Sequence, residues 1–118
     1  MPIARQKNTT MPTTRGSDRP LVSMMDGVQR RTMLWGTSML LAEIHLEEGG
    51  VVPLHDHPYE QIGYCIDGTF DFDIGEETHH IETGTSWVVP SNMPHKAVAT
   101  SKCFLIEVWS PARDDYKN

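Results

Sequence analysis

Residues 55–74 read HDHPYEQIGYCIDGTFDFDI, and this stretch decides the fold class. Its apolar run over 59–66 is closed by Asp67-Gly68, a dipeptide that is typical of tight turns between strands. Beyond the turn, Phe70, Phe72 and Ile74 alternate with polar residues. This period of two predicts a strand with one buried face.

The same pattern continues on both sides of this stretch. Short apolar or alternating runs, separated by Gly, Pro, Asn and Asp, are found at 39–46, 78–82, 86–89, 95–100 and 103–109. No stretch of 12 or more residues has a convincing helical period. The sequence therefore predicts an all-β sandwich or barrel.

Length and composition restrict the class of protein further. The 118 residues suffice for one domain, and 38% hydrophobic with 22% charged residues indicates a folded globular chain. No apolar run approaches the ~20 residues of a membrane span, so we expect no membrane association. The net charge of -6 argues against a nucleic-acid partner, because binding nucleic acid needs a basic surface.

The N-terminal residues 1–20 differ from the rest because they carry four basic residues and one acidic residue. We expect a flexible basic tail over 1–20 and one folded domain over 21–118. The two cysteines, Cys65 and Cys103, lie in apolar runs and are predicted to be buried thiols, although a catalytic thiol remains an alternative. Without the apolar core of a signal peptide, the sequence favours a cytoplasmic location.

Three of the six histidines form a pattern with chemical meaning. His55 and His57 are two residues apart, so in a strand their imidazoles share one face. Gln61 follows at the start of the next run, and His95 comes from a distant hairpin. Three imidazole nitrogens and an amide oxygen suit a divalent first-row metal. Taken alone, a His-x-His pair is weak evidence, since surface or core histidines are common.

Glycines and prolines around these histidines strengthen the metal hypothesis. Gly49 precedes His55 by six positions and Gly68 follows Gln61 by seven, while Gly84 and Pro90 precede His95. In this arrangement the chain resembles the cupin superfamily, which implies a double-stranded β-helix, also called a jelly-roll barrel. The resemblance departs at three positions: Gln61 stands for an acid, Asn92 for a glycine and Ala99 for an asparagine. Asparagine tolerates a positive φ angle better than most residues.

The strings HDHPYEQIGYCIDGTFDF, GTSWVVPSNMPH and EVWSPARDDY narrow the resemblance to the small cupins of pectin degradation, the KdgF type. This likeness implies a metal site at His55, His57, Gln61 and His95. It also implies that Glu107, Trp109 and Arg113 lie near the metal, where the family has Asp, Phe and Arg. The longer acid and the bulkier aromatic residue change the expected pocket and therefore the substrate that it would accept.

The residues themselves agree with a pocket at this strand. Glu107 is an acid on the same face as Cys103, Leu105 and Trp109, and a buried carboxylate is costly unless it is paired or faces a polar cavity. An edge-strand charge or an ion pair is the alternative. Arg113 has a planar guanidinium suited to a uronate carboxylate, although it could instead be a surface charge.

The family resemblance implies an enzyme that promotes ring opening of 4,5-unsaturated uronates to linear keto sugars, with Glu107 and Arg113 catalytic and Trp109 and Arg113 binding the small anionic substrate. One divalent ion is expected, and Ni, Zn, Mn, Fe and Co all fit the ligands. Another small-cupin enzyme (an oxygenase, isomerase or cyclase) and a non-catalytic binding protein remain alternatives. We also expect a homodimer in which residues 21–35 participate.

Overall fold

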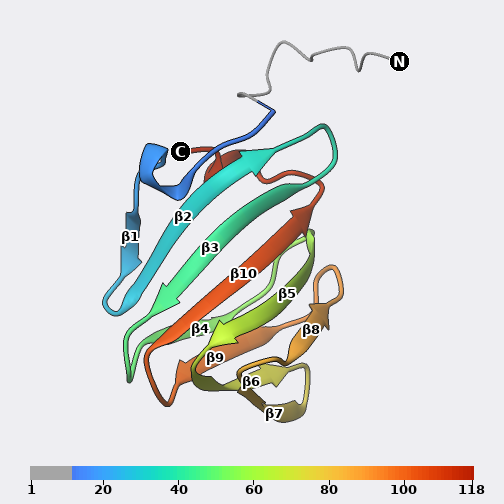
Figure 1. Ribbon diagram of the computed structural model, residues 1–118. Coiled ribbons are helices and arrows are strands. Elements are labelled where there is room, and N and C mark those ends of the chain that lie inside the picture. The colour runs from blue at the N-terminus through green and yellow to red at the C-terminus, as the bar shows by residue number, and fades with distance from the viewer. Residues whose placement is uncertain (1–11) are drawn as a thin grey trace.

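Two antiparallel β-sheets face each other in the computed structural model, which describes residues 12–118 (Figure 1). One sheet has six strands in the order β1-β2-β3-β10-β5-β8, and the other has four in the order β4-β9-β6-β7. The strands are β1 (Val22–Met25), β2 (Val28–Trp35), β3 (Leu40–Leu46), β4 (Val51–His55), β5 (Glu60–Asp67), β6 (Thr69–Ile74), β7 (Glu77–Glu82), β8 (Ser86–Val89), β9 (His95–Ala99) and β10 (Cys103–Ser110). Single 3-10 turns lie at η1 (Gly16–Asp18) and η2 (Asp114–Tyr116).

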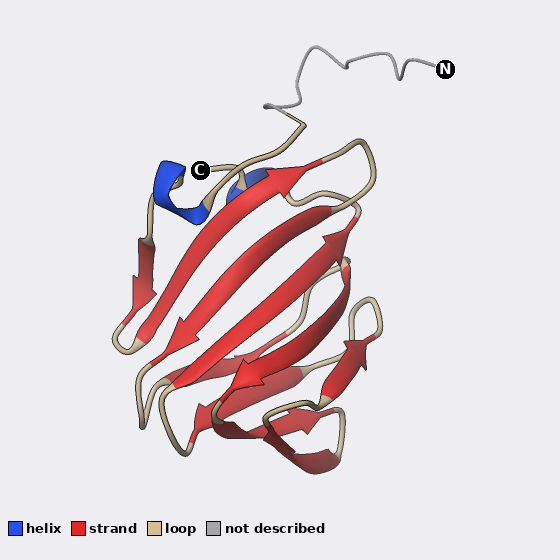
Figure 2. Cartoon of the chain, viewed as in Figure 1, coloured by secondary structure: helices blue, strands red, loops and turns tan. Residues whose placement is uncertain are grey.

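Strands dominate the described residues, as Figure 2 shows, and this confirms the predicted all-β barrel. The alternation seen in the sequence becomes the two faces of each sheet. In β3 and β10 every second residue is buried, and the buried face of β10 carries the predicted Cys103, Leu105, Glu107 and Trp109. The apolar members of these faces form the core between the sheets.

The register of the six-stranded sheet places a charged residue in that core. Glu107 of β10 lies opposite Ala42 of β3 on one side and Gly63 of β5 on the other. Gly63 in turn pairs with Trp87 of β8. Small residues on both neighbouring strands therefore leave room around the Glu107 carboxyl group.

The chain turns at Asp67-Gly68 as expected, but it does not form a hairpin there. β5 pairs with β8 and β10 in one sheet, whereas β6 pairs with β7 and β9 in the other, so the turn carries the chain between sheets. Gly68 has φ +108°, and a Cβ at this position would collide with the backbone of Lys102. Glycine is required here because the turn is crossed closely by another segment.

The N-terminal part of the described chain adds a hairpin to the predicted strands and a segment that contacts it. β1 and β2 form an additional hairpin at the edge of the larger sheet. Residues 1–11 of the predicted tail lie outside the described residues. Within 12–20, Arg19 donates from Nε to the carbonyl of Thr32 at 2.8 Å and lies over the ring of Trp35, so this end contacts β2.

Cys65 and Cys103 are buried free thiols, as the apolar runs around them predict. Burial raises the pKa of both thiols, which disfavours the reactive thiolate. None of the helices in residues 12–118 has the length and apolar character needed to cross a membrane.

Candidate metal centre and its pocket

Three histidines meet at one end of the β4–β9 strand pair. His55 ends β4 and lies in register with His95, the first residue of β9. His57 follows two residues after β4, so the predicted arrangement of both imidazoles on one strand is wrong. The chain leaves the strand but keeps the rings together, with centroids 5.5 Å apart for His55 and His57 and 4.1 Å apart for His55 and His95. Potential ligand atoms of the three residues all lie within 4.8 Å of one another.

Each imidazole is oriented by a backbone carbonyl two residues away. The Nδ1 atoms of His55, His57 and His95 lie 2.7, 2.9 and 2.8 Å from the carbonyl oxygens of Pro53, Tyr59 and Met93. A carbonyl only accepts, so Nδ1 carries the hydrogen in all three rings and Nε2 presents a lone pair. This is the support that metal-binding histidines usually have.

Two of these lone pairs have no suitable partner among the described residues. His95 Nε2 is buried without a hydrogen bond. His57 Nε2 lies 3.0 Å from Gln61 Oε1, which accepts a hydrogen bond from Trp109 Nε1 at 3.1 Å. Gln61 Nε2 donates to Glu107, which fixes the orientation of the amide. Two acceptors thus face each other.

A cation removes this conflict, whereas a proton is a poor substitute. Burial lowers the pKa of His57 and lowers that of His95 to about 4, so both rings are neutral at pH 7. The 3.0 Å between His57 Nε2 and Gln61 Oε1 is short enough that both atoms could bind the same ion. The donors present therefore fit a divalent first-row ion held by the three histidines, with the Gln61 oxygen beside them.

Glu107 is the acidic group next to these ligands. Its Oε2 accepts hydrogen bonds from Gln61 Nε2 and from Trp87 Nε1, the latter at 3.2 Å. Burial raises the pKa of Glu107 to about 7, although both hydrogen bonds and the charge of Arg113 oppose the rise. Because both hydrogen bonds go to Oε2 and Glu107 lines the pocket, Oε1 is the oxygen available to a ligand.

Trp87 is a site residue that the sequence did not reveal. It lies opposite Gly63, and a Cβ on Gly63 would collide with its indole ring. The missing side chain at residue 63 therefore lets Trp87 lie over β5 and reach Glu107. The only signal in the sequence is a glycine inside an apolar strand, which often marks a close approach of another group.

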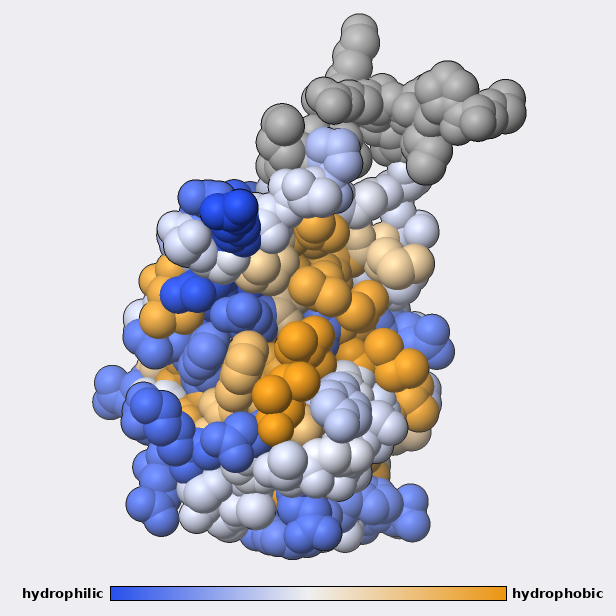
Figure 3. All heavy atoms as spheres, viewed as in Figure 1, coloured by the Kyte–Doolittle hydropathy of each residue, from blue (hydrophilic) through white to orange (hydrophobic). Residues whose placement is uncertain are grey.

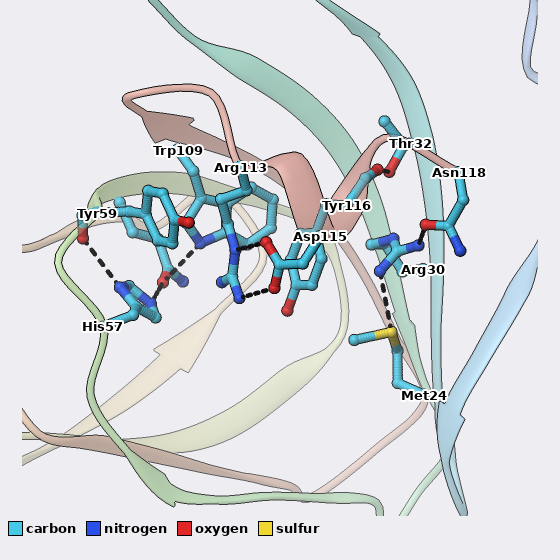
Figure 4. Close-up of polar contacts among 11 residues, drawn as sticks. Met24, Arg30, Thr32, His57, Tyr59, Trp109, Arg113, Asp115, Tyr116 and Asn118 are labelled. Carbon is cyan, nitrogen blue, oxygen red and sulfur yellow. Dashed lines mark hydrogen bonds and ion pairs between the residues drawn. The ribbon is translucent and has the colours of Figure 1, made fainter.

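Arg113 follows β10 and lies against aromatic rings at the same pocket (Figure 4). Its Cζ is 3.7 Å from the ring centroid of Tyr116 and 4.8 Å from that of Tyr59. Nε and Nη2 donate to the two carboxylate oxygens of Asp115 at 3.1 and 2.8 Å. This ion pair lowers the pKa of Asp115, so its carboxylate is charged at pH 7. No pattern in the sequence pointed to Asp115 or Tyr116 as partners of Arg113.

The structure brings the predicted site residues together. One pocket is lined by His55, Gln61, His95, Glu107, Trp109 and Arg113, and His57 contacts Gln61 beside it. The roles predicted for these residues stay predictions. The remaining histidines lie elsewhere: His45 stacks on Phe104 with ring centroids 4.8 Å apart, and His79 and His80 are exposed on β7.

Comparisons with known proteins agree with this architecture. The chain is 27% identical over 101 residues to the pectin degradation protein KdgF of Dickeya dadantii, covering 84% of this chain and 92% of that protein. The structure of KdgF from Halomonas sp. superposes with a TM-score of 0.83 at 26% identity, covering 90% of this chain and 98% of that one. An RmlC-like cupin from Shewanella frigidimarina, 23% identical, shares the fold with a TM-score of 0.87 over 92% of this chain and 97% of that one.

The family comparison covers most of the strands that build the pocket. Residues 42–109, from the middle of β3 to the end of the inner face of β10, match the cupin domain family Cupin_2. This range contains all three histidines, Gln61 and Glu107, and it spans more than half of the sequence. The chain therefore belongs to the cupin domain family.

Proposed function

We propose that this protein is a metal-dependent enzyme that opens the ring of 4,5-unsaturated uronates, the acidic sugars released when lyases cleave pectin or alginate. The observation that carries the proposal is the convergence of an acid, Glu107, and a guanidinium, Arg113, on the pocket with the histidine cluster. The likeness to the pectin degradation protein KdgF of Dickeya dadantii supports the substrate class.

Arg113 is the proposed carboxylate-binding residue. Asp115 engages Nε and Nη2, which form one of the two donor edges of the guanidinium. The other edge, Nη1 with the second hydrogen of Nη2, remains for a ligand, and its two parallel N–H groups match the oxygens of a uronate carboxylate. Asp115 therefore orients Arg113 without using both of its donor edges.

Glu107 is the proposed proton donor. Its Oε2 is held by Gln61 and Trp87, which leaves Oε1 to carry the proton and present it to the substrate. Burial keeps a large fraction of the carboxyl groups protonated near neutral pH. A positive ion nearby would lower this fraction, so the balance between burial and ion charge sets the working pH range.

His55, His57, Gln61 and His95 are the proposed ligands of one divalent ion whose identity is open among Ni, Zn, Mn, Fe and Co. Such an ion supplies positive charge that polarises a substrate oxygen. Gln61 is neutral and does not offset this charge as an acid would, and Trp109 holds its oxygen in place.

The proposed reaction balances as an isomerisation. Glu107 gives a proton to C4 of the enol ether while Arg113 holds the C6 carboxylate. Water adds to C5 and returns a proton to the Glu107 carboxylate. The bond between C5 and the ring oxygen of the resulting hemiketal then breaks, and the proton of the C5 hydroxyl passes to the ring oxygen, which leaves a ketone at C5. The ring oxygen becomes a hydroxyl on C1, and loss of one water there gives the linear aldehyde.

The test follows the loss of ultraviolet absorbance from the conjugated double bond of lyase-generated unsaturated galacturonate and guluronate. Metal-loaded protein should accelerate the loss well beyond the spontaneous rate, and a chelator should remove the acceleration. Decay at the spontaneous rate with both sugars, in protein shown to contain metal, would exclude this function.

The remainder of the pocket wall favours a second candidate, another small-cupin reaction on a less hydroxylated acid. This wall is apolar and includes Met24, Val28, Ile44, Leu46 and Val52. A sugar would place hydroxyl groups against side chains that cannot hydrogen-bond, which costs binding free energy. A panel of small acids separates the candidates: tighter binding of an apolar acid than of galacturonate would favour the second.

We also propose a homodimer that forms through the outer face of the six-stranded sheet. Three apolar residues are exposed on β5: Ile62, Tyr64 and Ile66. Val88, on the neighbouring strand β8, is also exposed and pairs with Ile62. Figure 3 shows hydrophobic residues gathered over this sheet. Within the described residues β1 pairs with β2 of the same chain, so participation of residues 21–35 in the dimer stays a prediction. The cytoplasmic location also stays a prediction. Sedimentation should give a dimer that Ile62→Lys dissociates; a monomer at micromolar concentration would contradict it.

A further inference from the structure

The segment after β10 packs across the inner face of β2 through one aromatic ring. The Tyr116 ring centroid lies 3.7 Å from Arg113 Cζ and 4.3 Å from Arg30 Cζ. Figure 4 shows the two arginines on either side of Tyr116. The ring also meets Trp109 edge to face, with centroids 5.1 Å apart. Tyr116 thus contacts both the proposed carboxylate-binding arginine and the residue that orients Gln61.

Arg30 is an unusual neighbour for this ring. It is only 2% exposed, and among residues 12–118 it forms no ion pair with a carboxylate. It donates to Met24 Sδ at 3.2 Å and to the side-chain oxygen of Asn118, while its Nε has no partner among the described residues. Leaving a buried guanidinium without a carboxylate is costly. The Tyr116 ring therefore offsets an important part of the cost of burying the Arg30 guanidinium.

The backbone holds Tyr116 from the same strand. Thr32, two residues after Arg30 on the inner face of β2, donates from Oγ1 to the Tyr116 carbonyl at 2.5 Å. One side of the ring is therefore fixed by β2 through Arg30 and Thr32. The other side supports the flat face of Arg113, whose Nε edge is fixed by Asp115. These contacts leave Arg113 little freedom to rotate.

We propose that Tyr116, fixed by Arg30 and Thr32, is a positioning residue that gives the pocket its preference for a carboxylate ligand by holding Arg113 with its free donor edge toward the pocket. This inference rests on the proposed role of Arg113 in binding an acidic substrate. Without the ring, Arg113 loses the support of one face and can turn toward solvent together with Asp115. The loss would affect charged ligands more than neutral ligands of the same shape.

The test compares Tyr116→Leu with Tyr116→Phe in metal-loaded protein, with galacturonate and its neutral methyl ester as probes in calorimetric titrations. Loss of a cation–π contact of ordinary strength by Tyr116→Leu should weaken galacturonate binding about 2- to 30-fold. Methyl ester binding and metal content should not change, and Tyr116→Phe should retain the affinity for the acid. In the uronate assay the same loss should appear in KM with kcat nearly unchanged.

Equal weakening of acid and ester by Tyr116→Leu would assign a merely structural role to the ring, and unchanged acid affinity would assign none; either result overturns the inference. If the wild-type protein binds neither probe, the proposed uronate function fails. The positioning role of Tyr116 is then tested by NMR in the absence of a ligand. NMR relaxation of the Arg113 Nε–H group should show an ordered guanidinium in the wild type and in Tyr116→Phe, and a mobile one in Tyr116→Leu. Equal order in all three proteins would overturn it.

Discussion

The two ends of the pocket are built in different ways. At the histidine end (His55, His57 and His95), each ring is fixed by a carbonyl only two residues away along the chain. At the arginine end (Arg30, Arg113 and Tyr116), Asp115 and Tyr116 hold Arg113 from nearby in the sequence, but the contacts that anchor Tyr116 to β2 join residues more than 80 positions apart. The histidine end is therefore defined by short motifs, whereas the arginine end depends on how β2 and the segment after β10 meet.

The largest effect is expected at the histidine end, where His57→Ala should remove most of the metal. The wild-type protein should contain about one divalent ion per chain by elemental analysis. His57 places Nε2 beside Gln61 Oε1 and is buried, so no neighbouring side chain can replace it. His45→Ala is the matched control because His45 stacks on Phe104 away from this site. Full metal retention in His57→Ala would place the ion elsewhere.

The difference between the two ends also explains what the sequence could predict. Period-two alternation predicted the buried face of β10 correctly because one face of this strand lies in the core and the other does not. The motif spacing placed the histidines and Gln61 near one another, and Asn92 does adopt the positive φ of +63° that its place in the motif suggested.

The residues that sequence patterns missed are those fixed by tertiary contacts. Arg30 resembles a surface charge in the sequence, since it is one of two consecutive arginines, yet its side chain is buried. Trp87 reaches Glu107 only because Gly63 lacks a side chain on the neighbouring strand. Similarly, a turn dipeptide cannot specify whether the chain returns in the same sheet, and at Gly68 it does not.

A smaller effect, on rate and not on metal content, is expected where the two ends meet at Glu107. Glu107→Gln keeps the shape of the side chain but removes the acidic proton. If Glu107 is the proton donor, turnover of the uronate should fall on the order of 10²–10⁴-fold, with metal content unchanged. Turnover close to that of the wild type would exclude the acid role and leave Glu107 as a structural charge.

The same variant separates the pH dependence of Glu107 from that of the histidines in metal-free protein. With its pKa raised to about 7, folded Glu107 keeps a proton that the unfolded chain releases near pH 4.5. Its stabilisation is therefore complete below pH 4.5 and is lost as the pH rises to about 7, by up to about 3 kcal/mol. His57 and His95 act in the opposite direction. Denaturant unfolding of the wild type and Glu107→Gln should diverge across this interval, and parallel curves would contradict the raised pKa.

The smallest effect tests whether the space between the ends matters as much as the groups that line it. Gly63→Ala adds one methyl group where the Trp87 indole lies, on β5 between the strands that carry Glu107 and Trp87. The backbone of β5 is fixed by pairing on both sides, so Trp87 must move, and overpacking of this kind costs about 1–3 kcal/mol of folding free energy. A displaced indole also loses its hydrogen bond to Glu107 Oε2, which removes one of the contacts that favour the ionised carboxylate. The pKa of Glu107 should therefore rise further, and the pH interval of the preceding experiment should shift upward. Val51→Ala, at an exposed position on the four-stranded sheet, is the control and should leave this interval unchanged. If Gly63→Ala lowered stability without moving the interval, Trp87 would be packing against Glu107 without contributing to its ionisation.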